Sequence, residues 1–303
     1  PHGLDKIEST VSDTYAAPDT ALYHKILTKE DTKTGQNLLT KSLRKPLGRD
    51  ADGLVAYFIN RPCSLQISKR IANSPITPNM ITAIGLVIGL AAAALVALGN
   101  QTAMIVAVIL WQISSMVDGI DGELARMRLS PSHRGEWFDT IADDITNITF
   151  MLGLGHGLYM LGEDFPFLGH HSSIYYFYIA IVVCSLMVIS VGWFYALFVK
   201  LGIASHNHFE WGFEADNKSN KSEEKRGFVK RIAEAIAGGF AWIAKRDFYT
   251  FLIMVLVICH LNKTAYFIML TGASFVGIGG IIALTLRTIR SCFKKKNSSA
   301  TNM

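Results

Sequence analysis

Half of the 303 residues are hydrophobic and the mean hydropathy is positive, a combination that is unusual for a soluble domain of this length. The formal net charge is +5 at pH 7. No nucleic-acid-binding motif accompanies this charge, so it suits anionic lipid headgroups and phosphates better than nucleic acid. The four cysteines have no metal-like spacing and are expected to be reduced apolar residues: Cys63, Cys184, Cys259 and Cys292. The composition therefore indicates an integral membrane protein.

Six long apolar segments predict an all-α membrane protein with six transmembrane helices. About 20 apolar residues are needed to cross a hydrocarbon core of ~30 Å, and each segment comes near this length when tilt is allowed. The fifth segment has the shortest apolar stretch. In chain order, the segments cover residues 80–99, 101–117 and beyond, 137–161, 174–201, 247–261 and 265–286.

Lysines and arginines are unevenly divided between the connections. They occur before the first predicted span, between the second and third spans, within residues 200–246 and in the tail from 287 to 296. The connections near Asn100 and at 162–172 contain neither, and Lys263 is the exception among the outer turns. By the positive-inside rule, both termini and the connection between spans two and three are cytoplasmic. We therefore expect a protein of the inner or plasma membrane.

Three parts are expected along the chain. Residues 1–50 form a polar cytoplasmic segment without the apolar core of a signal peptide, and the start at Pro1 suggests a fragment or a tag remnant. Residues 51–290 form the membrane domain. Within it, residues 222–244 carry an apolar stripe opposite charged residues, which predicts a cytoplasmic interfacial helix on the inner leaflet. Residues 291–303 form a basic polar tail.

Carboxylates gather where two predicted spans meet, in the segment VDGIDGELARMRLSPSHRGEWFDTIADD, residues 117–144. On a helix, Asp118 and Asp121 share one face. Asp139 and Asp143 repeat this arrangement on the next helix. Charged side chains are costly within a membrane, so converging carboxylates need compensation. Their oxygen ligands favour hard cations such as Mg²⁺, Mn²⁺ or Ca²⁺, and two such ions form a template for phosphoryl transfer.

The neighbouring residues fit a phosphate-containing ligand. Gly122 and Ala125 clear space against the second predicted span, and Gly135 does so where the third span begins. Arg126 supplies a positive charge for a phosphate. A nucleoside diphosphate would satisfy both metal ions and Arg126.

These positions resemble the signature of the CDP-alcohol phosphotransferase family. Its eight fixed positions are all present at the family's spacing: Asp118, Asp121, Gly122, Ala125, Arg126, Gly135, Asp139 and Asp143. The six-span topology is also similar, and the resemblance extends over residues 60–290. It implies a homodimeric, Mg²⁺-dependent membrane enzyme. Such an enzyme transfers a substituted phosphate from a CDP-alcohol to an acceptor hydroxyl and releases CMP.

The resemblance also implies roles for single residues. Two Mg²⁺ ions, for which Mn²⁺ is an alternative, would be held by Asp118, Asp121, Asp139 and Asp143. Asp143 would in addition be the catalytic base. The CDP part would be contacted by Gly122, Ala125, Arg126 and Gly135. The segment TPNMIT, residues 77–82, resembles the family's start of the first span, which places Asn79 near the nucleotide.

The donor and acceptor are left open. Several relatives that use inositol phosphate carry a basic residue after the last motif aspartate, where this chain has Asp144, and this weakens the case for a phosphorylated polyol acceptor. CDP-diacylglycerol is the commonest donor in the family. Residues 37–46 and 52–62 resemble the join to a cytidylyltransferase domain, which favours a soluble CDP-polyol donor instead.

Other roles remain to be weighed. A divalent cation transporter would also carry intramembrane carboxylates, but these acids gather at one end of the spans. Arg246 and Asp247 resemble a pair at the start of the fifth span in part of the family, and a structural ion pair and an acceptor-pocket role are both open. Glycines in the last span are a candidate dimer contact: Gly277, Gly279 and Gly280.

Overall fold

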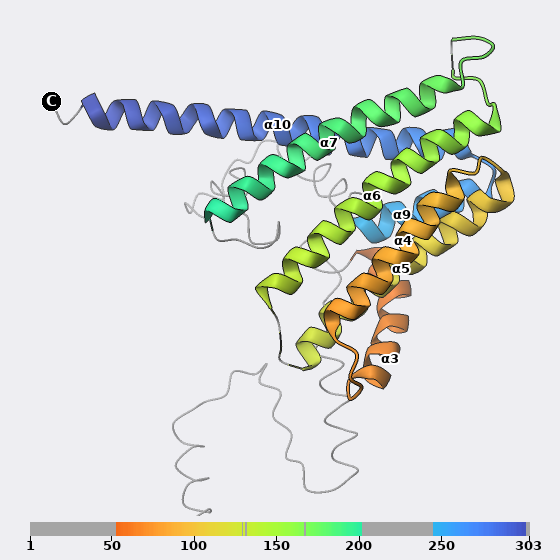
Figure 1. The fold of residues 1–303 in the computed structure, drawn as a ribbon, viewed down its shortest axis with the longest axis horizontal. Helices are drawn as coiled ribbons and strands as arrows, with labels where there is room; N and C mark the ends of the chain where they lie inside the picture. The colour runs from red at the N-terminus through yellow and green to blue at the C-terminus, as the bar shows by residue number, and fades with distance from the viewer. Residues whose placement is uncertain (1–52, 129, 131, 167, 202–244, 301–303) are drawn as a thin grey trace, which may run out of the picture. The chain divides into compact units, whose positions relative to one another are not determined.

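The computed structural model describes residues 53–128, 130, 132–166, 168–201 and 245–300 (Figure 1). The chain divides into the units Pro1–Lys45 and Pro46–Met303, and all described residues belong to the second unit. This part of the chain contains helices and no strand, which confirms the all-α prediction for it. The expected cytoplasmic segment 1–50 and the expected interfacial helix 222–244 lie outside the described residues.

Seven α-helices and one π-helical turn follow one another in the described residues. Their bounds are η1 Ala56–Asn60, α3 Arg61–Ile71, α4 Pro78–Val96, α5 Gln101–Met127, α6 His133–Leu161, α7 Ile174–Leu201, α9 Arg246–Ile258 and α10 Asn262–Ala300. The last helix continues through most of the segment that was expected to be a polar tail.

Local capping explains where several helices begin and end. The side chains of Thr77 and Asn100 cap α4 and α5, each accepting a hydrogen bond from the backbone N–H three residues on, at 3.3 and 2.8 Å. Ser132 caps α6 in the same way, so this helix starts before the expected span at residue 137. It ends at Gly162, whose φ of 72° is a left-handed conformation that suits glycine.

Four helices in the described residues are long and apolar enough to cross a membrane. They are α4, α5, residues Ile174–Ala196 of α7 and residues Asn262–Ile282 of α10. α9 has 13 residues; this is about 20 Å of helix, shorter than a hydrocarbon core of ~30 Å. α6 has 29 residues, but its first half carries charged side chains. Six transmembrane helices therefore stay a prediction, of which the described helices support four.

α4 lies beside α5 and α6, and the other helices pack on these two or on one another (Figure 1). It packs against both α5 and α6, while α6 packs on α7, α7 on α10, and α5 on α3 and α9. The approach of α6 to α4 depends on glycine, because a Cβ on Gly153 would meet the carbonyl oxygen of Ala93. α5 also contacts α6, where the rings of Trp111 and Phe150 stack with centroids 3.9 Å apart.

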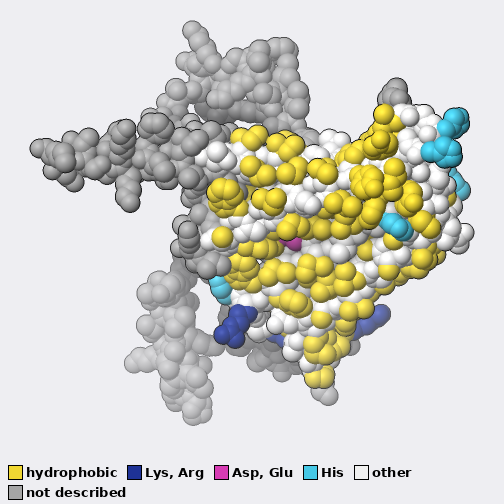
Figure 2. All heavy atoms as spheres, turned by 45° about the horizontal axis from the view of Figure 1, so that its top comes forward, with side chains coloured by type: hydrophobic (Ala, Val, Ile, Leu, Met, Phe, Trp, Pro, Cys, Tyr) yellow, Lys and Arg dark blue, Asp and Glu magenta, His cyan; other side chains and the backbone are white. Residues whose placement is uncertain are grey.

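The surface of these helices suits a lipid environment. Figure 2 shows a face on which hydrophobic side chains predominate, while the visible Lys and Arg side chains lie near one margin. Large apolar side chains are exposed on the spans, among them Val87 of α4 at 65% and Val182 of α7 at 59%. Apolar exposure on this scale is unusual for a soluble monomer and normal in a bilayer. The described residues thus support an integral membrane protein.

Two of the glycines proposed for a dimer contact pack within the chain instead. A Cβ on Gly280 would meet Ser190 of α7, and one on Gly277 would lie 3.4 Å from the backbone nitrogen of Met187. These glycines let α10 approach α7 closely. Gly279 has open space beside it. The homodimer therefore stays a prediction without an assigned contact.

Candidate active site

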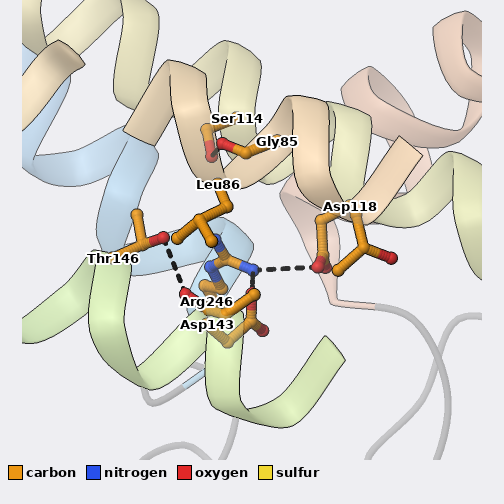
Figure 3. A pocket seen from close by; sticks show the side chains of 9 residues that line it. Gly85, Leu86, Ser114, Asp118, Asp143, Thr146 and Arg246 are labelled. Atoms are coloured by element: carbon orange, nitrogen blue, oxygen red, sulfur yellow. Dashed lines mark hydrogen bonds and ion pairs between the residues drawn. The ribbon is translucent and has the colours of Figure 1, made fainter. Parts of the chain in front are cut away.

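Four aspartates from two helices face one another at one end of the spans. Asp118 and Asp121 lie in the second half of α5, and Asp139 and Asp143 lie in the first half of α6. Carboxylate oxygens of Asp118, Asp121 and Asp139 lie within 4.8 Å of one another. Asp143 joins them through Arg246, whose guanidinium it shares with Asp118 (Figure 3). The expected convergence is observed, with α4 packed against both carboxylate-bearing helices.

The carboxylates lie in a largely buried setting. Asp121 is only 7% exposed and accepts hydrogen bonds from the Thr82 hydroxyl of α4 and from the backbone N–H of Gly122. Oδ1 of Asp139 is buried and has no hydrogen-bond partner among the described residues. Two ionised carboxylates 4.8 Å apart repel each other by about 3 kcal/mol at an effective dielectric constant of ~20. A cation between them would remove this repulsion.

The cluster fits a divalent metal ion. Its donors are carboxylate oxygens, which suit hard ions such as Mg²⁺, Mn²⁺ and Ca²⁺ rather than softer metals. The unpartnered oxygen of Asp139 is an available ligand at a place where a buried polar atom without a partner is otherwise costly. Asp118, Asp121 and Asp139 can therefore hold a metal ion together, as the sequence predicts.

Arg246, the first residue of α9, bridges the carboxylates of α5 and α6. Its Nη1 lies 3.2 Å from Oδ1 of Asp118 and donates to Oδ1 of Asp143. The Arg246 side chain is only 16% exposed, so solvent screens these ion pairs less than it would at the surface. The sequence places Arg246 at the start of the fifth span but contains no signal for this contact, which depends on the packing of α9 against α5.

Asp247 belongs to a different network from its neighbour. It accepts hydrogen bonds from Asn60 at 2.9 Å and from Ser115 at 3.1 Å. The amide oxygen of Asn60 accepts in turn from the buried Gln112 of α5 at 3.2 Å. These bonds tie the first turn of α9 to α5 and to the residue before α3. They fix the start of α9, and with it the backbone from which Arg246 reaches the aspartates.

A small cavity lies beside this ion pair. Its volume is about 10 Å³, which is close to the space that one water molecule needs. Its polar lining comes from four helices, and Figure 3 shows Asp118, Asp143 and Arg246 together with Thr146. A group the size of one hydroxyl therefore has room next to the carboxylate of Asp143.

A larger cavity of about 410 Å³ opens on Asp121 and Asp139. This volume lies in the usual range of small-molecule sites. All five residues that were expected to contact CDP line it: Asn79, Gly122, Ala125, Arg126 and Gly135. Its wall also contains polar residues to which the sequence assigned no role: Thr77, Ser130, Ser132, Glu136 and Thr140. The structure thus gathers the expected nucleotide residues beside the aspartates.

The two motif glycines leave room for the groups that line this cavity. A Cβ on Gly135 would lie 2.8 Å from Oγ of Ser132, which caps α6, and 3.1 Å from Oδ1 of Asn79. A Cβ on Gly122 would lie 3.3 Å from a guanidinium nitrogen of Arg126. A larger residue at either position would displace groups that line the cavity.

Glu123 is an important residue that the sequence analysis did not single out. It is completely buried in α5, one residue after the motif glycine. Its carboxylate accepts from Arg61 at 2.8 Å and from Ser64 and Ser68 at 2.7 Å, all on α3. These three polar residues lie on one face of α3, and from this pattern a buried acidic partner could have been predicted. The contact docks α3 against the helix that carries the first two aspartates.

Two further side chains fix the surroundings of the site. Arg128 donates to backbone carbonyls at the end of α3 and in the following connection, at 2.6 to 2.9 Å: those of Ile71, Ala72, Ser74 and Ile76. Asp144, which stands where some relatives have a basic residue, accepts a hydrogen bond from the Tyr195 hydroxyl of α7. Both contacts are structural, and they hold α3 and α7 next to the motif helices.

Comparison with known proteins agrees with this site. The chain matches the profile of the CDP-alcohol phosphatidyltransferase family over residues 75–279. The bifunctional IPC transferase and DIPP synthase of Archaeoglobus fulgidus is 35% identical over 133 residues, which are 44% of this chain and 26% of that protein. The protein of the same name from Thermococcus kodakarensis is 33% identical over 129 residues, 43% of this chain and 28% of that protein.

Archaetidylinositol phosphate synthase of Pyrococcus horikoshii is 34% identical over 92 residues, 30% of this chain and 47% of that protein. The matched part of the chain thus spans about a quarter of the two bifunctional relatives and about half of the third. The family profile covers all eight signature positions as well as Arg246. The chain is therefore a transferase and belongs to the CDP-alcohol phosphatidyltransferase family.

Proposed function

We propose that the protein transfers a substituted phosphate group from a CDP-alcohol to the hydroxyl of an acceptor alcohol and releases CMP. The observation that carries this proposal is the 410 Å³ cavity, in which the five expected nucleotide residues surround a space that opens on Asp121 and Asp139. The cavity proposed for the nucleoside diphosphate thus adjoins carboxylates that can hold a metal ion.

The aspartates would hold two Mg²⁺ ions, for which Mn²⁺ can substitute, through Asp118, Asp121, Asp139 and Asp143. Bound there, the ions would neutralise phosphate charge as the bond to CMP breaks. Three of these carboxylates already lie within 4.8 Å of one another, which supports their shared role. Asp143 shares the Arg246 guanidinium with Asp118 in the structure, and we propose it as the fourth ligand.

The CDP part would lie in the large cavity against Asn79, Gly122, Ala125, Arg126 and Gly135. The guanidinium of Arg126 would pair with a phosphate oxygen, since Arg recognises phosphate with two parallel hydrogen bonds. The glycines would let the nucleotide lie close to the helix backbone. The crowding that a Cβ would cause at Gly122 and Gly135 supports this role.

Asp143 would act as the catalytic base. An alcohol is a weak nucleophile until its proton leaves, so a carboxylate must lie within hydrogen-bond reach of the attacking oxygen. The small cavity beside Asp143 can accept a hydroxyl group. The acceptor oxygen would form its bond to phosphorus while the bond from phosphorus to the CMP oxygen breaks, and the acceptor proton would pass to Asp143. Arg246 would keep the Asp143 carboxylate directed at this cavity.

The donor is proposed to be CDP-diacylglycerol or a soluble CDP-polyol. The cavity residues would contact only the CDP part, which both donors contain. The names of the relatives from Archaeoglobus fulgidus and Pyrococcus horikoshii support phospholipid or polar-headgroup biosynthesis. The name archaetidylinositol phosphate synthase indicates a phosphorylated inositol product for that relative. In this chain Asp144 is bonded to Tyr195 and adds negative charge near the site, which argues against a second phosphate there.

We further propose six transmembrane helices, a homodimer, and termini and active site on the cytoplasmic side. The basic connections support this orientation. Cysteine labelling tests it: residues 130–134 should react from the same side as the N-terminus, and residue 164 from the opposite side. Labelling of residue 132 from the side of residue 164 would separate the site from cytosolic CDP-alcohols and contradict the proposal.

Binding of CMP to the purified full chain tests the function itself. We expect binding in Mg²⁺ and none after chelation with EDTA. Gly122→Leu should abolish binding and retain the helical circular-dichroism spectrum, because the leucine side chain would occupy nucleotide space. CMP binding that is unaffected by EDTA would refute the metal assignment. Divalent ion flux into proteoliposomes without CMP binding would instead favour a transporter.

A further inference from the structure

The large cavity contains one acid that the proposed metal site does not use. Glu136 lies in the first turn of α6 and lines the cavity together with Asp121 and Asp139. Its side chain is partly buried, and among the described residues no ion pair or side-chain hydrogen bond satisfies its carboxylate. An acid without a cation is unexpected in the wall of a site for an anionic nucleotide.

The position of Glu136 on α6 separates it from the phosphate end of the cavity. It precedes Asp139 by three residues, so the two side chains share a helix face and are offset by about 4.5 Å along the axis. Asp139 belongs to the aspartate cluster, where the proposed function places the diphosphate. Glu136 is one turn nearer the start of the helix, where Ser132 and Ser130 also line the wall.

Charge decides which part of the nucleotide can lie there. A carboxylate next to the diphosphate would repel it, whereas the nucleoside is neutral. An ionised carboxylate can only accept hydrogen bonds. Cytosine offers it the two N–H bonds of the 4-amino group, and a Glu that accepts from this amine is a known way to read cytosine. Uracil has a carbonyl oxygen at that position. This oxygen carries partial negative charge and would be repelled by the carboxylate.

We infer that Glu136 is the residue that selects cytosine, by accepting a hydrogen bond from its 4-amino group. This inference rests on the proposed function, because it requires a CDP-alcohol in the large cavity. A first-turn Glu also stabilises the helix through the helix dipole. That effect is the same for every nucleotide and does not change the ratio of CMP to UMP affinity.

The test measures the affinities of the full chain in detergent and Mg²⁺ for CMP and UMP by isothermal titration calorimetry. Wild type should bind CMP on the order of ten-fold more tightly than UMP or better, as a base contact of this kind provides. In Glu136→Gln the ratio should fall to within about three-fold, because an amide can donate to the uracil oxygen as well as accept from the cytosine amine. Glu163→Gln, which removes a carboxylate beyond the opposite end of α6, should keep the wild-type ratio.

Each outcome decides one of the two proposals. No binding of either nucleotide to wild type would overturn the proposed function. CMP binding with an unchanged CMP-to-UMP ratio in Glu136→Gln, or with equal losses for both nucleotides, would overturn the role of Glu136 alone. If Glu136→Gln does not fold, wild type is titrated with N4,N4-dimethyl-CMP, which lacks the two N–H donors. Binding of this compound at least ten-fold weaker than CMP supports the inference, and equal binding refutes it.

Discussion

Replacement of Glu123 with alanine should release α3 from α5. The carboxylate is 0% exposed and accepts three hydrogen bonds from α3, one of them from the Arg61 guanidinium at 2.8 Å. Removal of one partner from a buried ion pair costs about 3–5 kcal/mol, because the other charge loses its compensation. Since 1.4 kcal/mol is ten-fold in an equilibrium constant, α3 should open on the order of 10² to 10³ times more often.

Hydrogen–deuterium exchange followed by mass spectrometry measures this opening directly. Peptides from residues 61–71 should lose protection by that factor in Glu123→Ala, while peptides from the middle of α6 should exchange as in wild type. Gln66→Ala is the matched control, because Gln66 lies on the exposed face of the same helix. Equal exchange of α3 in the two variants would show that Glu123 does not hold this helix, and the reasoning from the buried ion pair would be wrong.

Four further substitutions separate the parts of the site. Asp143→Asn should lower turnover by a factor on the order of 10² or more and keep Mg²⁺-dependent CMP binding, whereas Asp118→Asn should lose both; near-normal turnover of Asp143→Asn would exclude it as the base. Gly135→Ala should weaken CMP binding in a titration, because its Cβ would lie 3.1 Å from Oδ1 of Asn79; unchanged affinity would show that the nucleotide does not approach this wall. Arg246→Gln should lower kcat and leave CMP affinity within about three-fold, since Arg246 touches the aspartates and not the large cavity; a large loss of CMP affinity would assign it to the nucleotide instead.

The aspartate cluster could be predicted because its residues lie close together in the sequence. Asp118 and Asp121 are three residues apart on one helix, as are the positions that clear space next to them, so helix geometry alone brings them to one face. The short connection to α6 then limits how far Asp139 can lie from them. The structure bears out this convergence, and it also brings Asn79, from the start of α4, to the same cavity.

The contacts of Arg246 and Glu123 could not be predicted in the same way. Arg246 reaches Asp143 across 103 residues of sequence, through the packing of α9 on α5, and no spacing rule relates these positions. Glu123 looks like an ordinary polar residue of a helix end until Arg61 and the two serines of α3 are placed against it. Both contacts arise from tertiary packing. Which helices pack together depends on many small contributions to the free energy of folding.

The helix boundaries were predicted least well where polar residues continue a helix beyond its apolar part. α6 begins at His133 because Ser132 caps it, although its apolar stretch begins later. α3 escaped notice because two of its three buried residues are serines, so no apolar face marks it in the sequence. Pro62 in its first turn and Lys69 and Arg70 in its last are typical signals of a helix start and end, and they were available in the sequence.

α4 explains why carboxylates from two helices can meet without the helices closing on each other. Gly89 of α4 lies between Ser114 of α5 and Thr146 of α6, and a Cβ on it would lie 3.2 Å from the serine hydroxyl and collide with the threonine. Ser114 also donates to the carbonyl oxygen of Gly85 at 2.8 Å, so α5 is held against the same stretch of α4. Small residues on α4 therefore bring α5 and α6 near enough for their aspartates to share a cation, while α4 packs against both helices. The space that remains at the start of α4 is the large cavity, so the spacing of the carboxylates and the room for a nucleotide have the same structural cause.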